Sequence, residues 1–220
     1  MELQDLVLYE LPVLSLKDSG TKALALMNDF QIHQLPIIER DDYLALVQED
    51  DLLDWDTPEE SLAKAKFLNF RPAVFETMHP FDAIKVIKEF NLSILPLLDN
   101  DQNFIGCITR NNLFQFLTDT NTFKQEGGII ILRVAPIEYS LAEIARLAES
   151  DNILLQGVLV RQLTDENILQ VTIKTNKHDL RSFVATLRRY EYQIEATYNA
   201  LLDDQSLQDN YDMLMRFFDL

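Results

Sequence analysis

The hydrophobic positions in the first half of the chain follow a pattern that occurs twice. Residues 23–30 place apolar side chains at helical spacing, and residues 83–90 repeat this stripe 60 positions later. In both copies the stripe is followed by an apolar run around a proline, a polar turn, a second apolar run and a leucine. The matching segments are 34–38 and 94–98, then 43–47 and 104–108, and finally Leu52 and Leu113. An internal repeat of this kind predicts two copies of one supersecondary unit.

Each copy is predicted to form a short strand, a helix, two strands joined by a turn, and a final helix. The proline suits the first residue of a strand, where no ladder N–H is required. Neither copy can bury its helix face alone, so we expect the two copies to pack against each other. Between them, Thr57 to Glu60 have the residue types of a capping box and predict a short helix through about Phe67.

A different pattern begins after Gly127 and Gly128. Apolar runs and helical stripes then follow in the order β-α-β-β-α-β, which predicts a ferredoxin-like domain and an α+β chain overall. The predicted strands are 129–134, 153–163, 168–173 and 194–198, and the predicted helices are 140–149 and 180–190. Ser140 and Glu143 form a capping box at the start of the first helix, and Gly157 is expected at a bulge.

Residues 199–220 are predicted to be an acidic tail that ends in an amphipathic helix. Its apolar stripe consists of Leu207, Tyr211, Leu214, Met215 and Phe218. Two hypotheses fit this stripe. The helix packs on its own domain or on a dimer mate, or it docks on a partner protein.

Charge narrows the range of partners. The net charge of −17 argues against binding to nucleic acid, which needs a basic face, and against binding to an anionic membrane surface. Residues 1–123 hold 9 basic and 21 acidic side chains (net −12), whereas residues 124–198 hold 9 and 10 (net −1). This step in charge indicates a domain boundary near residue 124.

Side chains that carry catalysis in other proteins are scattered here. His33, His79 and His178 do not lie at metal-ligand spacing, and the chain has no glycine-rich phosphate loop. Cys107 lies within an apolar run, where a buried inert thiol is expected. We therefore expect a protein that is not an enzyme and holds no metal. One cysteine, no apolar run of membrane-spanning length and no signal-peptide pattern at the first residues predict a cytoplasmic location.

The repeated unit resembles the CBS domain, named after cystathionine β-synthase, which occurs in tandem pairs. The second copy carries LPL at 95–97 and GCITRNNL at 106–113, close to the family's proline motif and its Gly-x-x-Thr-x-x-Asp-like end. The first copy carries LPI at 35–37 and ALVQEDDL at 45–52, a looser match. The resemblance covers residues 1–123, with repeat 1 at 1–57 and repeat 2 at 58–123.

In CBS pairs that bind adenine nucleotides, the resemblance implies that the closing Thr meets phosphate and the closing Asp meets the ribose hydroxyls. Carried over by position, repeat 1 keeps Asp51 but has Gln48 in the Thr place, and repeat 2 keeps Thr109 but has Asn112 in the Asp place. The implied ligand is AMP, ADP, ATP or S-adenosylmethionine. Alternatively, these residues only cap the helices that they precede.

Three further features bear on where a nucleotide would bind. Gly106 leaves room for a ligand to approach the backbone closely. Five carboxylates are expected near repeat 1 and would repel a phosphate chain, so repeat 2 is the better candidate site. These carboxylates are Asp41, Asp42, Glu49, Asp50 and Asp54.

Residues 124–198 resemble an ACT domain, a module that commonly senses amino acids. Domains of this family that bind effectors usually carry an acidic residue and Pro-Gly after the first strand, but here residues 135–139 contain no glycine. Dimerisation through a sheet edge or the helices is therefore the expected role. The order CBS–CBS–ACT also resembles proteins of the acetoin-utilisation protein B type, which are regulatory.

Two hypotheses of function follow. In the first, the chain is a homodimeric regulatory sensor whose CBS pair binds an adenine nucleotide and whose ACT-like domain sets the dimer. In the second, it is an interaction or scaffold protein that keeps both folds but has lost small-molecule binding. The degenerate closing motifs favour the second hypothesis, and titration with the four adenine ligands distinguishes the two.

Overall fold

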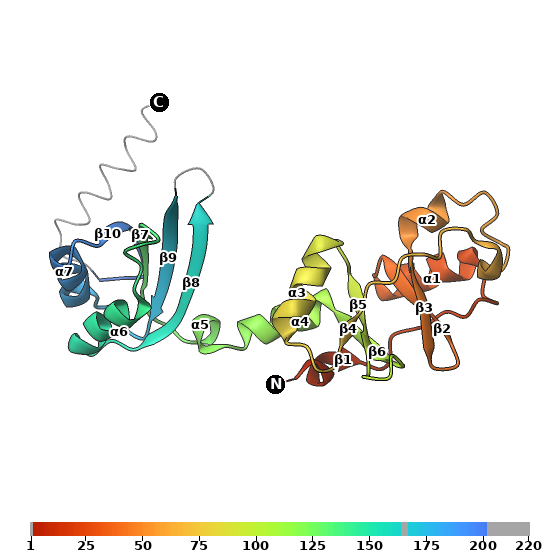
Figure 1. The fold of residues 1–220 in the computed structure, drawn as a ribbon, viewed down its shortest axis with the longest axis horizontal. Coiled ribbons are helices and arrows are strands. Elements are labelled where there is room, and N and C mark those ends of the chain that lie inside the picture. The colour runs from red at the N-terminus through yellow and green to blue at the C-terminus, as the bar shows by residue number, and fades with distance from the viewer. Residues whose placement is uncertain (1, 164–166, 202–220) are drawn as a thin grey trace, which may run out of the picture. The chain divides into compact units, whose positions relative to one another are not determined.

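The repeat in the sequence is visible as two similar groups of strands and helices within residues 1–117, called unit 1 (Figure 1). The computed structural model describes residues 2–163 and 167–201, and unit 2 begins at Thr118. The helices of unit 1 are η1 (Leu3–Leu6), α1 (Gly20–Phe30), α2 (Glu49–Leu53), η2 (Leu62–Lys64), α3 (Pro80–Glu89) and α4 (Arg110–Thr118). Its strands are β1 (Val7–Leu8), β2 (Gln34–Glu39), β3 (Asp42–Gln48), β4 (Val74–Phe75), β5 (Ile94–Leu98) and β6 (Phe104–Thr109).

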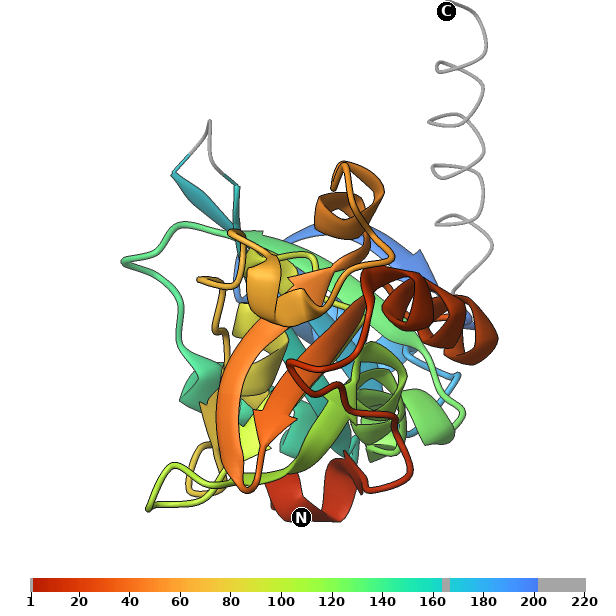
Figure 2. The ribbon, with the colours of Figure 1, turned by 90° about the vertical axis from the view of Figure 1, so that its right-hand side faces the viewer.

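The two copies use equivalent strand pairings. Strands β2 and β3 form one antiparallel hairpin, which lies toward the viewer in Figure 2, and β5 and β6 form the other. Leu14 bridges Ile37 in parallel, as Val74 pairs with Leu97. The prolines differ from the prediction because each is the third residue of its strand, not the first.

The position of Pro36 explains why a proline is tolerated inside a strand. Its partner Leu46 turns its N–H away from β2 and donates to the Phe70 carbonyl at 2.8 Å. On the other side the Pro36 carbonyl accepts from the Leu14 N–H at 2.8 Å. The ladder therefore does not need an N–H at this residue.

The first strand of the chain joins the sheet of the second copy. β1 pairs antiparallel with β6, Val7 opposite Ile108 and Leu8 opposite Cys107, so the sheet has the order β1-β6-β5-β4. In the first copy the connector takes the equivalent place through Phe70, whose carbonyl accepts from β3. Each copy is thus completed by a segment that lies outside its own run of elements.

The two copies share one hydrophobic core, as the sequence predicts. Met27 of α1 and Ile87 of α3 are both buried in it, together with the inner residues of β2, β3, β5 and β6. Because burial of apolar area is the main driving force for folding, we expect neither copy to be stable alone.

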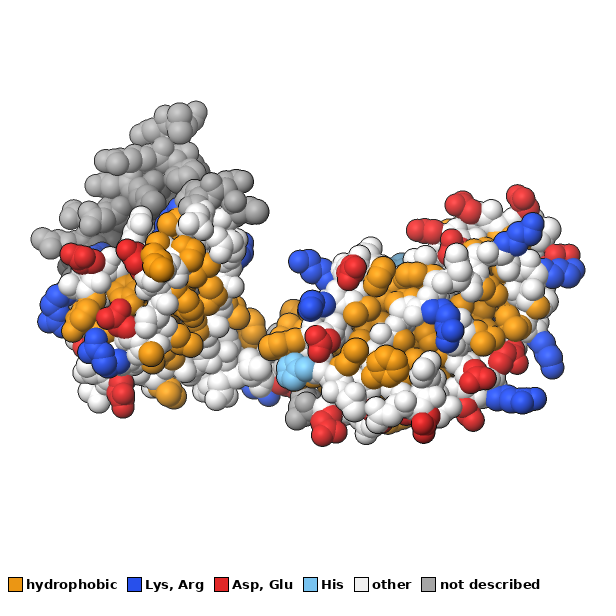
Figure 3. Space-filling view, in the orientation of Figure 1, with side chains coloured by type: hydrophobic (Ala, Val, Ile, Leu, Met, Phe, Trp, Pro, Cys, Tyr) orange, Lys and Arg blue, Asp and Glu red, His pale blue; other side chains and the backbone are white. Residues whose placement is uncertain are grey.

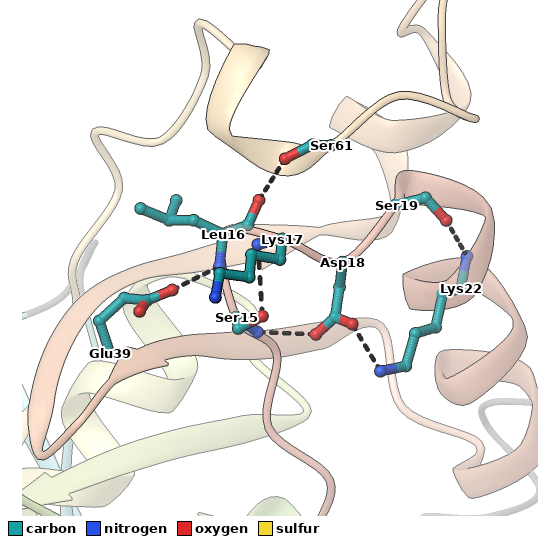
Figure 4. A network of polar contacts seen from close by, with 8 residues as sticks. All are labelled: Ser15, Leu16, Lys17, Asp18, Ser19, Lys22, Glu39 and Ser61. Atoms are coloured by element: carbon teal, nitrogen blue, oxygen red, sulfur yellow. Dashed lines mark hydrogen bonds and ion pairs between the residues drawn. The ribbon is translucent and has the colours of Figure 1, made fainter.

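The connector between the copies does not form the predicted helix through Phe67. The Pro58 carbonyl accepts from the Thr21 N–H, while the N–H groups of Leu62 and Ala63 donate to the Asp18 and Leu16 carbonyls. These long-range hydrogen bonds replace the helical ones, and only the short η2 remains. Figure 4 shows the surrounding network, in which the Ser61 hydroxyl donates to the Leu16 carbonyl at 2.5 Å and the Glu39 carboxylate accepts from the Leu16 N–H at 2.8 Å.

Unit 2 has the predicted β-α-β-β-α-β order and the ferredoxin-like sheet order β10-β7-β9-β8. Its strands are β7 (Ile129–Val134), β8 (Leu155–Leu163), β9 (Ile168–Thr175) and β10 (Gln193–Tyr198), and its helices are α5 (Asn121–Lys124), α6 (Leu141–Ser150) and α7 (Arg181–Arg189). Alternate residues of β7, such as Ile130 and Leu132, are buried against α6 and α7. These helices cover one face of the sheet.

Of the local signals predicted in unit 2, the Ser140 cap and the bulge at Gly157 form, whereas the Glu143 half of the predicted capping box does not. The Ser140 hydroxyl accepts from the Glu143 N–H at 3.2 Å and caps α6. The Glu143 carboxylate instead accepts from the Tyr192 hydroxyl at 2.8 Å. The β8–β9 register shifts between Leu155 and Gly157, which confirms the bulge. The predicted amphipathic helix with Leu207 to Phe218 lies outside the described residues.

Candidate functional site

Unit 1 contains a cavity of ≈ 830 Å³ at the start of α4, called the Thr109 cavity below. It is lined by the end of α1, the segment before β2, the residues around β1 and the first turn of α4. The lining residues are Leu8, Leu11, Phe30, Gln31, Ile32, His33, Ser93, Thr109, Arg110, Asn111, Asn112 and Phe114. The lining therefore combines apolar side chains with hydroxyl, amide and guanidinium groups.

The structure brings Thr109 and Asn112, predicted as a pair from the closing motif, into this cavity. The Thr109 hydroxyl accepts from the Asn112 N–H at 3.0 Å and donates to the Asn112 side-chain oxygen. The first contact is that of a helix cap on α4. The Asn112 amide nitrogen lacks a hydrogen bond within the described residues, so it can donate to a ligand.

Arg110 supplies the positive charge of the Thr109 cavity. Its guanidinium donates to the Leu92 carbonyl at 2.9 and 2.6 Å and to the Asn91 side-chain oxygen at 3.1 Å. All these acceptors are neutral, so within the described residues the charge of Arg110 is not paired with a carboxylate. The described lining also contains no Asp or Glu. The α4 N-terminus adds a partial positive charge, and the cavity therefore favours an anion.

A second cavity of ≈ 590 Å³ lies at the equivalent place of repeat 1 and is called the Gln48 cavity below. It is lined by His33, Gln34, Gln48, Glu49, Asp50, Phe90, Asn91 and Arg110. The His33 ring nitrogen Nδ1 lies 2.6 Å from the Glu49 carboxylate. This cavity is thus acidic where the Thr109 cavity is basic.

The predicted site residues of repeat 1 lie in different places. Gln48 lines the Gln48 cavity and makes no side-chain cap on α2. Asp51 lines a third cavity of ≈ 460 Å³ together with Asp54 and Trp55, and it does not face the Thr109 cavity. Of the four predicted positions, only Thr109 and Asn112 therefore share a cavity.

The expected carboxylates around repeat 1 are also dispersed. Only Glu49 and Asp50 line the Gln48 cavity. Asp41 and Asp42 lie instead at the β2–β3 turn, where the Asp41 carbonyl accepts from the Phe104 N–H at 2.9 Å and Asp42 bridges Asn103. The expected acidic surrounding thus reduces to two side chains at the start of α2.

Gly106 does not provide space for a ligand, contrary to the sequence-based expectation. A Cβ atom at this residue would lie 2.5 Å from Cγ1 of Val7. The glycine is buried and makes room for β1, which pairs with β6 at this point. Its role is therefore in packing between segments distant in sequence.

Sequence reasoning missed much of the Thr109 cavity because four separate segments build it. Arg110 directly follows Thr109 and could have been found by comparing the two closing motifs, where its counterpart is Glu49. Ser93 corresponds to His33, and the two residues meet at the junction of the copies. The His33 N–H donates to the Ser93 hydroxyl at 3.0 Å.

Histidine and cysteine side chains have structural surroundings. His79 caps α3 by accepting from the Phe81 N–H at 3.1 Å, and His178 Nδ1 lies 2.6 Å from the Asn199 carbonyl oxygen. Burial raises the pKa of the Cys107 thiol to about 12, so it stays protonated at neutral pH. Within the described residues, no helix is long and apolar enough to cross a bilayer.

Comparisons with known proteins locate the family. Residues 71–119 match the model of the CBS domain. A CBS domain pair/ACT domain protein from Thermotoga maritima is 20% identical, with 54% of this chain and 98% of that chain covered and a TM-score of 0.47. CBSX2 in complex with AMP is 22% identical, with 53% of this chain and 95% of that chain covered and a TM-score of 0.47. A putative acetoin utilization protein (AcuB) from Vibrio cholerae is 18% identical, with 54% of this chain and 91% of that chain covered and a TM-score of 0.47.

The match begins at Arg71, just before β4, and ends at Asp119, just after α4, so it includes the GCITRNNL segment. The preceding residues repeat the same order of elements at matching positions. The predicted fold class, a pair of CBS repeats followed by a ferredoxin-like domain, is confirmed. The CBS domain match thus covers residues 71–119, which hold the second copy of the repeat from β4 to α4.

Proposed function

We propose that this chain is a non-catalytic regulatory protein that binds an adenine nucleotide in the Thr109 cavity. The observation that carries the proposal is the composition of that cavity. The lining combines apolar side chains, among them Leu8, Phe30 and Phe114, with the polar side chains of Thr109 and Arg110, and the described lining has no carboxylate. A flat base needs apolar contacts and a phosphate needs hydroxyl and guanidinium donors.

The residues take distinct roles in this proposal. The Arg110 guanidinium and the first turn of α4 attract the phosphate, and the Thr109 hydroxyl turns from Asn112 to donate to it. The Asn112 amide then binds a ribose hydroxyl. Gln48 and Asp51 remain outside this arrangement because they line other cavities.

A second candidate function is that of a ligand-free interaction or scaffold protein. It is supported by the hydrogen bonds between Thr109 and Asn112, which satisfy each other and cap α4 without a ligand. In this reading the closing motif is retained for the stability of the fold.

We also propose that the chain forms a homodimer, to which the ACT-like unit 2 contributes. β8 is an edge strand and carries Leu159 and Val160 at 57% and 46% exposure. In unit 1, Phe30 and Phe90 are also exposed near the ends of α1 and α3, and apolar side chains gather over the strands of both repeats in Figure 3. Light scattering is expected to give a mass well above that of the 25.5 kDa chain. The chain mass itself at micromolar concentration would contradict the dimer.

Isothermal titration with AMP, ADP, ATP and S-adenosylmethionine tests the proposed function. Thr109→Ala should weaken nucleotide binding, and Asn112→Asp should strengthen it, each several-fold or about 1 kcal/mol for a charge-assisted hydrogen bond. Asp51→Asn is the matched control and should leave affinity unchanged, because Asp51 lies in another cavity. If the parent protein binds none of the four compounds, the scaffold function is supported instead.

A further inference from the structure

The two cavities of unit 1 adjoin each other. His33 and Arg110 line both of them, so these two side chains form the boundary between the Thr109 cavity and the Gln48 cavity. A ligand that fills the first cavity and extends beyond Arg110 therefore enters the second.

Glu49 and Arg110 occupy equivalent positions on the two sides of this boundary. The Glu49 N–H donates to the His33 carbonyl at 2.9 Å, and the Arg110 N–H donates to the Ser93 carbonyl at 2.9 Å. Each is also the first residue of its helix, α2 or α4. The backbone is thus alike, but the charge is opposite.

On the acidic side the Glu49 carboxylate has a contact of its own. The His33 ring nitrogen holds the Glu49 carboxylate at 2.6 Å, and Asp50 follows it in the lining of the Gln48 cavity. The only cation on this lining within the described residues, besides any charge on His33, is the shared Arg110. A phosphate chain that passes Arg110 would approach two carboxylates.

We infer that Glu49 and Asp50 make the Thr109 cavity selective for adenosine with a single phosphate over adenosine di- and triphosphates. This inference rests on the proposed function. One phosphate is accommodated by Arg110 and the α4 N-terminus. Each further phosphate adds negative charge on the side of the two carboxylates, and the repulsion between like charges grows with each one.

The test is titration of the full chain with AMP and ATP in the presence of EDTA, since bound Mg²⁺ would neutralise the phosphates. We expect AMP to bind at least about tenfold more tightly than ATP. Glu49→Gln and Asp50→Asn, as single and double variants, should raise the affinity for ATP and so reduce its difference from the affinity for AMP. Asp56→Asn is the matched control: it removes the same charge from the third cavity and should leave the ratio unchanged.

Each outcome distinguishes this inference from the proposed function. Equal binding of AMP and ATP by the parent, or a ratio unaffected by the Glu49 and Asp50 variants, overturns the inference and leaves nucleotide binding standing. If the parent binds no adenine compound, the proposed function and this inference fall together. Melting temperatures confirm that each variant is folded. The single variant Asp50→Asn retains the His33–Glu49 contact, so it tests the removal of charge without the loss of that contact.

Discussion

Removal of one buried aromatic ring from unit 2 should destabilise that unit and leave the stability of unit 1 unchanged. Phe183 of α7 is 0% exposed and belongs to a core of unit 2 residues, separate from the core shared by the two repeats. Phe183→Ala removes its packing and leaves a cavity, at a cost of about 3–5 kcal/mol. Domains of this size have a total stability of only about 5–15 kcal/mol.

The expected shift is large enough to measure in urea. For a small domain the free energy of unfolding falls by about 1–3 kcal/mol per molar urea, so Phe183→Ala should lower the midpoint of unit 2 by about 1–5 M. Far-UV circular dichroism follows both units. Trp55, the single tryptophan of the chain, lies in unit 1 with its ring 5.6 Å from that of Phe67, and its fluorescence follows unit 1 alone.

The two probes should therefore separate in the variant. The dichroism should show an early transition, while the Trp55 transition should stay at the midpoint of the parent. Leu97→Ala, which truncates a fully buried side chain of the unit 1 core, is the reciprocal control and should shift the Trp55 transition. If Phe183→Ala moves the Trp55 transition as well, the two units unfold together and the domain boundary proposed near residue 124 is wrong.

Two further predictions concern unit 2. Gly157→Val should detach α5 from β8, because even a Cβ atom there would lie 2.2 Å from the Thr122 hydroxyl oxygen, and faster hydrogen exchange of the α5 amides checks this. Burial and a hydrogen bond to Glu143 raise the pKa of Tyr192 to about 12. Because the pKa of Tyr192 is higher in the folded than in the unfolded state, the contact stabilises the folded state below pH 10, and this stabilisation is lost as the pH rises toward 12. Ultraviolet titration should show a lower pKa of Tyr192 in Glu143→Gln.

Local regularities in the sequence were sufficient for most of the fold. The spacing of apolar residues predicted the helices that contain Met27 and Ile87, and the 60-residue offset predicted two equivalent hairpins with a shared core. The order of elements in unit 2 and the bulge at Gly157 also followed from local signals. In these places propensity, periodicity and turn chemistry agree with one another.

Contacts between distant segments account for the errors. The connector around Pro58 has a capping box, but its N–H groups find carbonyls near Asp18 instead of forming a helix. Gly106 is required by Val7, a residue almost 100 positions earlier whose pairing with β6 leaves no local signal. A pattern within ten residues cannot show which distant backbone will occupy the neighbouring place in a sheet.

The same reasoning applies to the candidate site. The closing motif predicted Thr109 and Asn112, which lie three positions apart at a helix start and therefore stay together in any fold that forms α4. Leu8 and Phe30 come from β1 and α1, and only the folded arrangement brings them beside α4. Lining residues close in sequence could thus be grouped in advance, and those joined by tertiary structure could not.

The pair Glu49 and Arg110 shows how duplication of a fold can separate from duplication of its chemistry. Their backbone N–H groups make equivalent bonds at the same distance, so the two copies present a side chain to adjoining cavities from equivalent places. A substitution that exchanges charge at such a position leaves the core untouched because neither side chain belongs to it. Binding can therefore be concentrated in one cavity while both copies continue to stabilise each other, and the intact core of repeat 1 is no sign that repeat 1 binds a nucleotide.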